Sequence, residues 1–125
     1  MDKKTVLLTG GGAGIGEGIA QVLAQRGWHV LVNDIDADAA HRVARAVDGT
    51  ALPGDICHDP DGLVRAAAAA RGTLDALVNN AGIIRRSQLA ETSVADMDMV
   101  YEVNIKAMVR LSQQALPWLE KTGGA

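Results

Sequence analysis

The stretch Thr9-Gly-Gly-Gly-Ala-Gly-Ile-Gly16 decides the fold of this chain. A short apolar run rich in β-branched residues, 5–9, precedes it and indicates a buried strand, and a helical run, 15–26, follows it. A glycine-rich loop in this place lets the backbone turn tightly. It also brings a pyrophosphate close to the amides of a helix N-terminus, where the helix dipole favours anions. The stretch therefore predicts a dinucleotide-binding loop, with a purely structural tight turn as the alternative.

The spacing of the glycines distinguishes this loop from two other phosphate-binding patterns. Glu17 stands where a P-loop requires lysine, and no three glycines have the spacing G-x-G-x-x-G. The glycines that follow a rule are Gly10, Gly14 and Gly16, in the pattern T-G-x-x-x-G-x-G.

Outward from the loop, short apolar runs alternate with helical runs along the whole chain. We expect strands at 5–9, 29–33, 50–53 and 74–78, and helices at 15–26, 36–47, from Pro60 to Gly72, and from about 94 to 119. Alternation at this spacing is typical of βαβ units with right-handed crossovers. The sequence therefore predicts an α/β fold, a doubly wound parallel sheet with strand order 3-2-1-4. Ligands would bind at the carboxyl ends of its strands.

Composition limits the classes of protein to which the chain could belong. It has 125 residues, a formal charge of -3, and 48% apolar residues, which indicates one globular domain. The slightly acidic balance argues against a nucleic-acid or anionic-membrane partner. No apolar stretch approaches the roughly 18 residues of a membrane span. Cys57, the only cysteine, cannot form an internal disulfide, so we expect a soluble, cytoplasmic protein.

Asp34, at the carboxyl end of the second expected strand, bears on the choice of cofactor. A carboxylate there can accept both hydroxyls of an adenosine ribose and repels a 2′-phosphate. A helix-capping aspartate in a turn is the alternative, and it is the better interpretation of Asp36 and Asp38. No Arg or Lys occurs between Asp34 and Asp38. The sequence therefore favours NAD over NADP.

With these residues identified, the chain resembles the short-chain dehydrogenase/reductase family, and specifically its N-terminal, cofactor-binding half. The resemblance covers nearly the whole chain, and its motifs occur in the family's order. They are T-G-x-x-x-G-I-G at 9–16, the acidic Asp34, Asp55-Ile56, Asn79-Asn80-Ala81-Gly82, and Asn104 in Val103-Asn104-Ile105. The resemblance implies a Rossmann-type NAD-binding domain over residues 1–125.

The family's functional residues carry over onto these motifs. The resemblance implies that the cofactor's pyrophosphate lies on the glycine loop, its adenine ribose on the acidic residue, and its adenine on the D-I pair. The residues implied to bind cofactor are Gly10, Gly14, Ile15, Gly16, Asp34, Asp55, Ile56, Asn80, Ala81 and Gly82. Asn79 is expected to tie strands together instead.

Asn104 is the one catalytic residue that the resemblance implies, as the asparagine that helps to hold a water in a proton relay. Helical spacing puts it on one face with apolar residues, which predicts a buried stripe: Met97, Val100, Asn104, Met108 and Leu111. A buried amide must find hydrogen-bond partners. A structural amide that bonds neighbouring backbone would satisfy this requirement equally well.

The family's tyrosine, four residues before a lysine, and its serine have no match in these residues. Tyr101 is the only tyrosine, and Lys106 is the nearest lysine downstream of it. We therefore expect the domain to be incomplete at its C-terminus and this chain alone to be inactive. A fragment, a split partner and a naturally complete chain remain open.

The activity implied is that of an NAD-dependent oxidoreductase acting on the hydroxyl or carbonyl carbon of a small alcohol or ketone. The alternative is a non-catalytic dinucleotide-binding or interaction module that is complete at 125 residues.

The sequence also bears on self-association, on metal binding and on two arginines near the expected substrate entrance. An exposed edge at strand 74–78 and an uncovered face of the final helix predict a homo-oligomer, dimer or tetramer, unless further residues cover them. Cys57 and His58 have poor metal geometry, so no metal site is expected. Arg85 and Arg86 could meet an acidic substrate, with a solvated loop as the simpler interpretation.

Overall fold

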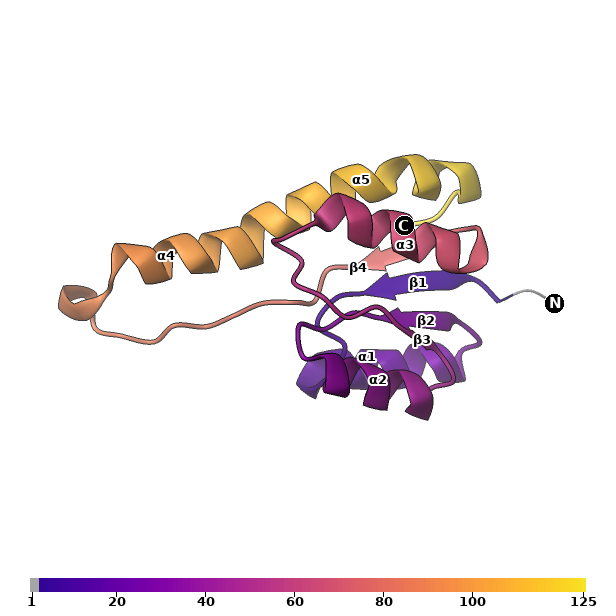
Figure 1. Cartoon of the computed structure of the whole chain (residues 1–125), viewed down its shortest axis with the longest axis horizontal. Helices are drawn as coiled ribbons and strands as arrows, with labels where there is room; N and C mark the ends of the chain where they lie inside the picture. The colour runs from indigo at the N-terminus through magenta and orange to yellow at the C-terminus, as the bar shows by residue number, and fades with distance from the viewer. Residues whose placement is uncertain (1–2) are drawn as a thin grey trace.

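Four parallel strands form the centre of the molecule (Figure 1). The structure is a computed structural model and describes residues 3–125. The strands are β1 (Thr5–Leu8), β2 (His29–Val32), β3 (Thr50–Ala51) and β4 (Ala76–Val78), in the order β3-β2-β1-β4. Every neighbouring pair is parallel. The predicted doubly wound sheet and its strand order are therefore confirmed.

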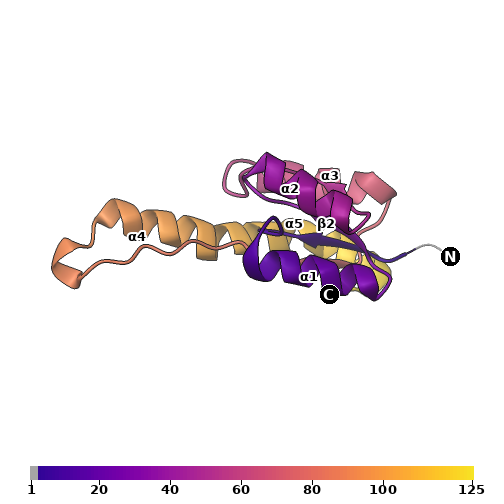
Figure 2. The same ribbon diagram turned by 90° about the horizontal axis from the view of Figure 1, so that it is seen from below.

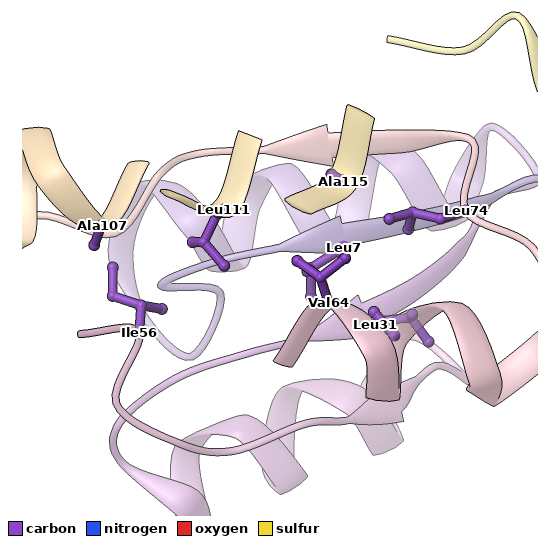
Figure 3. Close-up of a cluster of buried hydrophobic side chains, with 9 residues drawn as sticks. Leu7, Leu31, Ile56, Val64, Leu74, Ala107, Leu111 and Ala115 are labelled. Carbon is purple, nitrogen blue, oxygen red and sulfur yellow. The ribbon is translucent and has the colours of Figure 1, made fainter. Parts of the chain in front are cut away.

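Helices cover both faces of this sheet (Figures 1 and 2). One face carries α1 (Gly14–Gln25) and α2 (Ala37–Ala46), and the other carries α3 (Pro60–Arg71) and α5 (Ala107–Thr122). Because side chains alternate along a strand, Val6 and Leu8 pack on the first face and Leu7 on the second. Figure 3 shows the second face, where Leu7 and Leu31 meet α3 and α5.

Local signals explain where the helices begin and end. Asp36 caps α2 by accepting a hydrogen bond from the Ala39 amide, and Asp59 caps α3 in the same way through the Gly62 amide. Pro60 stands at the first position of α3, and Gly72 ends it in the left-handed conformation with φ of 77°. These four residues carry the helix signals that the sequence contained.

The final helix differs from the single helix predicted. It consists of α4 (Val94–Tyr101), a π-helical turn η2 (Glu102–Lys106) and α5, preceded by a short 3-10 turn η1 (Leu89–Glu91). Its first half extends beyond the carboxyl ends of the strands, where no sheet lies beneath it (Figure 1). Met97 is therefore 59% exposed, whereas Leu111, over the sheet, is fully buried. The predicted buried stripe is correct for Leu111 and wrong for Met97 and Met108.

The outer edge of β4 is partly covered by residues 123–125. The Ala125 amide donates to the Asp75 carbonyl at 3.0 Å, and the Leu77 amide donates to the Ala125 carbonyl at 2.9 Å. The open edge expected from the sequence is thus paired at these positions, because Gly123, with φ of 66°, turns the chain back onto the strand.

None of the helices in residues 3–125 combines the length and the apolar character that a membrane-crossing helix needs.

Candidate functional site

A cavity of about 390 Å³ opens at the carboxyl ends of the strands. Its walls come from the loops that follow β1, β2, β3 and β4, which is where a doubly wound sheet binds ligands. The predicted site residues that line it are Gly10, Ile15, Gly16, Asp34, Asp55, Ile56, Asn80, Ala81 and Gly82. Gly14 and Asn104 are not among the lining residues. The structure therefore brings together, in one cavity, nearly all the residues that the sequence singled out.

The glycine loop packs too closely for side chains at several positions, Gly10 and Gly16 among them. Gly10 has φ of 64°, and a Cβ there would lie 2.8 Å from the Ala81 Cα. A Cβ at Gly16 would collide with the carbonyl oxygen of Gly10. These glycines let the loop fold against itself and against the loop after β4.

The first helix begins at this loop without a cap. Ala13 is its N-cap residue and makes no side-chain hydrogen bond, and the Glu17 amide donates to the Ala13 carbonyl at 3.2 Å. The amides that precede this bond have no partner within the helix. Because Ala13, Ile15 and Gly16 line the cavity, this helix end can receive an anion there.

Asp34 faces the same cavity and is fixed by two backbone amides. Its Oδ2 accepts from the Gly12 amide at 2.9 Å, and its Oδ1 accepts from the Asp36 amide at 3.0 Å. A carboxylate offers about four acceptor positions. About two therefore remain, enough for the two hydroxyls of a ribose.

Thr9 and Asn80 join the loops that follow β1 and β4. The Thr9 hydroxyl oxygen accepts from the amides of Asn80 and Ala81, each at 3.1 Å. The Asn80 Nδ2 donates to the carbonyls of Thr9 at 3.2 Å and Gly10 at 3.0 Å. Asn80, predicted to line the cofactor site, thus also ties these two loops together.

Asn79 does not have the place that the sequence suggested. Its Nδ2 donates to the Ser112 hydroxyl at 3.1 Å, so it connects the end of β4 to α5 and not one strand to another. The expectation was wrong because adjacent residues after a strand point to opposite faces, and only Asn80 faces the glycine loop.

Asn33 is a residue of this site that the sequence reasoning missed. It is buried, and its Nδ2 donates to the carbonyls of Leu52 at 2.9 Å and Gly54 at 3.2 Å. These bonds hold the loop after β3 against β2 and so place Asp55 and Ile56 at the cavity. A polar residue directly after a buried apolar strand was the signal that could have identified Asn33.

Asn104 lies in the π-helical turn and makes both of its hydrogen bonds to one residue, Ile83. Its Oδ1 accepts from the Ile83 amide at 2.8 Å, and its Nδ2 donates to the Ile83 carbonyl at 2.9 Å. Both halves of the side-chain amide are thereby engaged with backbone. π-helical turns occur often at functional sites. Here the turn places the Asn104 amide against the loop that follows Gly82, at the end of the cavity.

Arg42, on α2, is a second residue that the sequence reasoning missed. Its Nη2 donates to the Gly12 carbonyl at 2.8 Å, and its guanidinium makes two bonds of 3.2 Å to the carboxylate of Glu17. The hydrogen bond from Arg42 holds the pKa of Glu17 below its ordinary value. No local motif marks Arg42, because its partners are 25 and 30 residues away.

The remaining candidates lie outside the cavity. Arg85 binds the Ile84 carbonyl and lies 3.9 Å from Asp96. Burial raises the pKa of the Cys57 thiol. Within residues 3–125, no three His, Cys, Asp or Glu side chains are grouped so that they could hold a metal ion.

Known proteins are similar to this chain over nearly its whole length. A family model described as short chain dehydrogenase matches residues 4–125. An uncharacterized oxidoreductase of Thermotoga maritima is 36% identical over an alignment of 126 positions that covers 97% of this chain and 50% of that protein. The 7alpha-hydroxysteroid dehydrogenase of Escherichia coli K12 is 37% identical over an alignment of 131 positions that covers 99% of this chain and 51% of that enzyme.

A solved structure is similar throughout the described fold. It is the 3-ketoacyl-(acyl-carrier-protein) reductase of Brucella melitensis complexed with NADH, with a TM-score of 0.91 and 34% identity. The match covers 96% of this chain and 52% of that chain. This chain therefore spans about half the length of each of these three proteins.

Proposed function

We propose that this chain, which belongs to the short-chain dehydrogenase family, is the NAD-binding part of an NAD-dependent oxidoreductase. The substrate proposed is a small alcohol or ketone. The observation that carries the proposal is the position of Asp34, beside an uncapped helix N-terminus in one cavity. Relatives that are oxidoreductases support the reaction class, and a similar structure that contains NADH supports a nicotinamide dinucleotide.

The residues present fit such a cofactor chemically. The amides at the start of α1 suit the anionic pyrophosphate, with Gly10, Gly14, Ile15 and Gly16 shaping that loop. Asp34 has acceptor capacity for the adenosine ribose. Apolar side chains of Ile15, Ile35 and Ile56 line the same cavity and suit flat aromatic rings. Asp55, Asn80, Ala81 and Gly82 would complete the walls.

When bound, NAD would supply the hydride donor or acceptor for a hydroxyl or carbonyl carbon. The chain's own residues bind and orient it. Asn104 keeps the proposed place in the proton relay, and its bonds to Ile83 support a positioning contribution at the substrate end of the cavity. A proton must also move to or from the substrate oxygen, and the tyrosine-lysine pair that the family uses is not among these residues. We propose that these 125 residues alone are inactive.

Asp34 supports NAD over NADP. A 2′-phosphate would meet a carboxylate whose two oxygens are already oriented into the cavity by the amides of Gly12 and Asp36. We also propose a cytoplasmic location and a homo-oligomer, dimer or tetramer, assembled through the final helix. No nucleic-acid, membrane or metal partner forms part of the proposal.

Titration of the purified protein with both cofactors tests the assignment. We expect NAD⁺ to bind more tightly than NADP⁺. Asp34→Ala should weaken NAD⁺ binding by about tenfold to a hundredfold, because it removes a hydrogen-bond acceptor for the ribose. It should also narrow the difference between the affinities for NAD⁺ and NADP⁺, because it removes the repulsion of the 2′-phosphate. Asp38→Ala, which changes an exposed carboxylate in the first turn of α2, four residues after Asp34, is the matched control and should alter neither affinity. Tighter binding of NADP⁺ by the unmodified protein would contradict the cofactor choice.

The second candidate function is a dinucleotide-binding module without catalysis, which the same cavity with Asp34 and the uncapped start of α1 would support. It predicts tight NAD⁺ binding with no turnover of any alcohol or ketone by the protein in its natural form. Turnover that Asn104→Ala reduces would decide for the oxidoreductase.

A further inference from the structure

Arg42 connects three segments of the proposed cofactor site. From α2 it donates to the Gly12 carbonyl in the glycine loop, and it makes a two-pronged ion pair with Glu17 in the first turn of α1. We propose that Arg42, held by Glu17, is a positioning residue that orients Asp34 toward the adenosine ribose by fixing Gly12. This inference rests on the proposed NAD-binding function.

Gly12 is held on both sides of its Cα. Its amide donates to the Asp34 Oδ2 at 2.9 Å, and its carbonyl accepts from the Arg42 Nη2 at 2.8 Å. A Cβ at Gly12 would lie 2.7 Å from the Asp34 Oδ2 and 2.8 Å from the Ala39 Cβ, so the glycine is wedged against both. A movement of Gly12 therefore transfers directly to the Asp34 carboxylate.

Burial separates this arrangement from an ordinary surface ion pair. Gly12 is buried, and a buried backbone carbonyl needs a hydrogen-bond donor. Arg42 supplies it. The Arg42 side chain is 55% exposed and that of Glu17 28%, so their charge attraction alone contributes little in water. The contribution of Glu17 is orientation, because two parallel bonds hold the guanidinium plane in place.

Two consequences for the cofactor follow from a fixed Gly12. Two acceptor positions of Asp34 stay directed into the cavity, which removes part of the ordering cost of binding a ribose. The Gly12 carbonyl belongs to the same peptide group as the amide of Ala13, the uncapped N-cap residue of α1. The direction of the backbone at this helix end therefore depends on the same hydrogen bond from Arg42. The pairing of Glu17 with Arg42 also offsets a negative charge close to where a pyrophosphate would lie.

The test uses the purified full-length protein and two measurements. Binding of NAD⁺ is measured by calorimetry, and the hydrogen exchange of the Gly12 amide is measured by NMR without cofactor. We expect Arg42→Gln and Glu17→Gln to weaken NAD⁺ by about tenfold and to speed Gly12 exchange by a similar factor. Arg65→Gln, which breaks the exposed Arg65–Asp61 pair on α3, is the matched control and should change neither quantity.

A double-variant cycle with Asp34 separates positioning from a general loss of structure. If Arg42 acts through Asp34, then adding Arg42→Gln to Asp34→Ala should cause little further loss of affinity for NAD⁺. Arg42→Lys keeps the charge without the two-pronged geometry and should behave like Arg42→Gln. The thermal transition of each variant verifies that it is folded, and a variant that unfolds is replaced by Glu17→Gln in the cycle.

The outcomes differ for the two proposals. If the unmodified protein binds NAD⁺ and Arg42→Gln binds it equally well, or if the two substitutions in the cycle are additive, the positioning role is overturned and the NAD-binding function stands. If the unmodified protein binds no NAD⁺, the proposed function fails, and the role of Arg42 in orienting Asp34 toward the ribose fails with it.

Discussion

Two glycines on the same helix, Gly16 and Gly18, have opposite surroundings. A Cβ at Gly16 would collide with the Gly10 carbonyl and lie 2.6 Å from the Asn80 Nδ2. At Gly18 there is nothing within 4 Å. Of these two glycines, only Gly16 is required for the close approach of the glycine loop to α1, although both look alike in the sequence.

We predict that Gly16→Ala destabilises the protein by about 1–3 kcal/mol and abolishes measurable NAD⁺ binding, because the loop must move to admit the methyl group. Gly18→Ala should instead stabilise it by about 0.5–1 kcal/mol, since alanine favours a helix interior. Urea denaturation of both variants, with calorimetry for NAD⁺, measures these effects. Equal behaviour of the two variants would mean that the loop does not pack on α1 as described.

Single residues also show why part of the site could not be predicted. Asp34, Gly10 and Gly16 have recognisable positions relative to a strand and a helix, and the structure places them at one cavity. Arg42 has no such local mark, because its partners lie 25 and 30 residues away. Asn33 has only the mark of a polar residue after a buried strand, which does not reveal that its partners are backbone groups 19 and 21 residues away. The partner of Asn79, the Ser112 hydroxyl, depends on how the final helix lies against β4, which the sequence does not contain.

At the level of elements, the π-helical turn η2 joins the part of the final helix that covers the sheet to the part that extends beyond it (Figure 2). Asn104 occupies this turn and binds both the amide and the carbonyl of Ile83. This side chain therefore contributes two bonds that hold the loop after β4 against the final helix.

Asn104→Ala should leave the Ile83 backbone without these two partners, at a cost of about 1–3 kcal/mol in the free energy of unfolding. Hydrogen exchange at the Ile83 amide should become faster, while exchange in β1 and β2 stays unchanged apart from the global effect. Asn104→Asp retains the acceptor but not the donor and is the graded control. Unchanged protection of Ile83 in Asn104→Ala would show that the loop is held by other contacts.

A second link between elements lies at the opposite end of the sheet. His29, at the start of β2, is 2.9 Å from the Thr50 hydroxyl of β3 through its Nε2. Burial lowers the pKa of His29 below its ordinary value of 6.5, and the positive charges of Arg71 and Lys3 lower it further. The folded protein therefore favours the neutral imidazole.

Because the pKa of His29 is lowered in the folded protein, acid should destabilise the fold. Stability from His29 is complete above the unfolded pKa, near 6.5, and is lost as the pH falls from there toward the lower folded value. We predict that His29→Gln loses less stability than the unmodified protein between about pH 8 and about pH 5. Urea denaturation at both pH values measures this difference. His41→Gln, at an exposed position on α2, is the control, and an equal loss in His29→Gln and unmodified protein would contradict the assignment.

At the scale of the whole molecule, the sheet order and the layers could be predicted because each depends on local patterns. Apolar runs predicted the strands, Asp59-Pro60 and Gly72 marked the ends of α3, and right-handed crossovers reduced the possible arrangements to a few. The extension of α4 beyond the sheet could not be predicted. The apolar residues 97, 100 and 108 of the final helix are spaced as in a buried helix, and the sequence does not show whether the sheet covers them.

That extension leaves a large apolar surface exposed within the described residues. Side chains of α4, η2 and the start of α5 contribute to it, among them Met97, Met99, Tyr101, Ile105, Met108 and Val109. Apolar patches of this kind mark protein interaction sites more often than free surface. We therefore predict that the protein self-associates through this segment.

Sedimentation velocity of the purified protein over a range of concentrations tests this prediction. We expect a dimer or tetramer, and we expect Met97→Glu combined with Ile105→Glu to weaken self-association by at least about tenfold, since a charge buried at an apolar contact is costly. Val22→Glu changes an exposed apolar residue on α1, in the opposite layer, and should leave the mass unchanged. A monomer at every concentration, with a sharp thermal transition, would mean that the apolar surface of α4 is stable in water by itself.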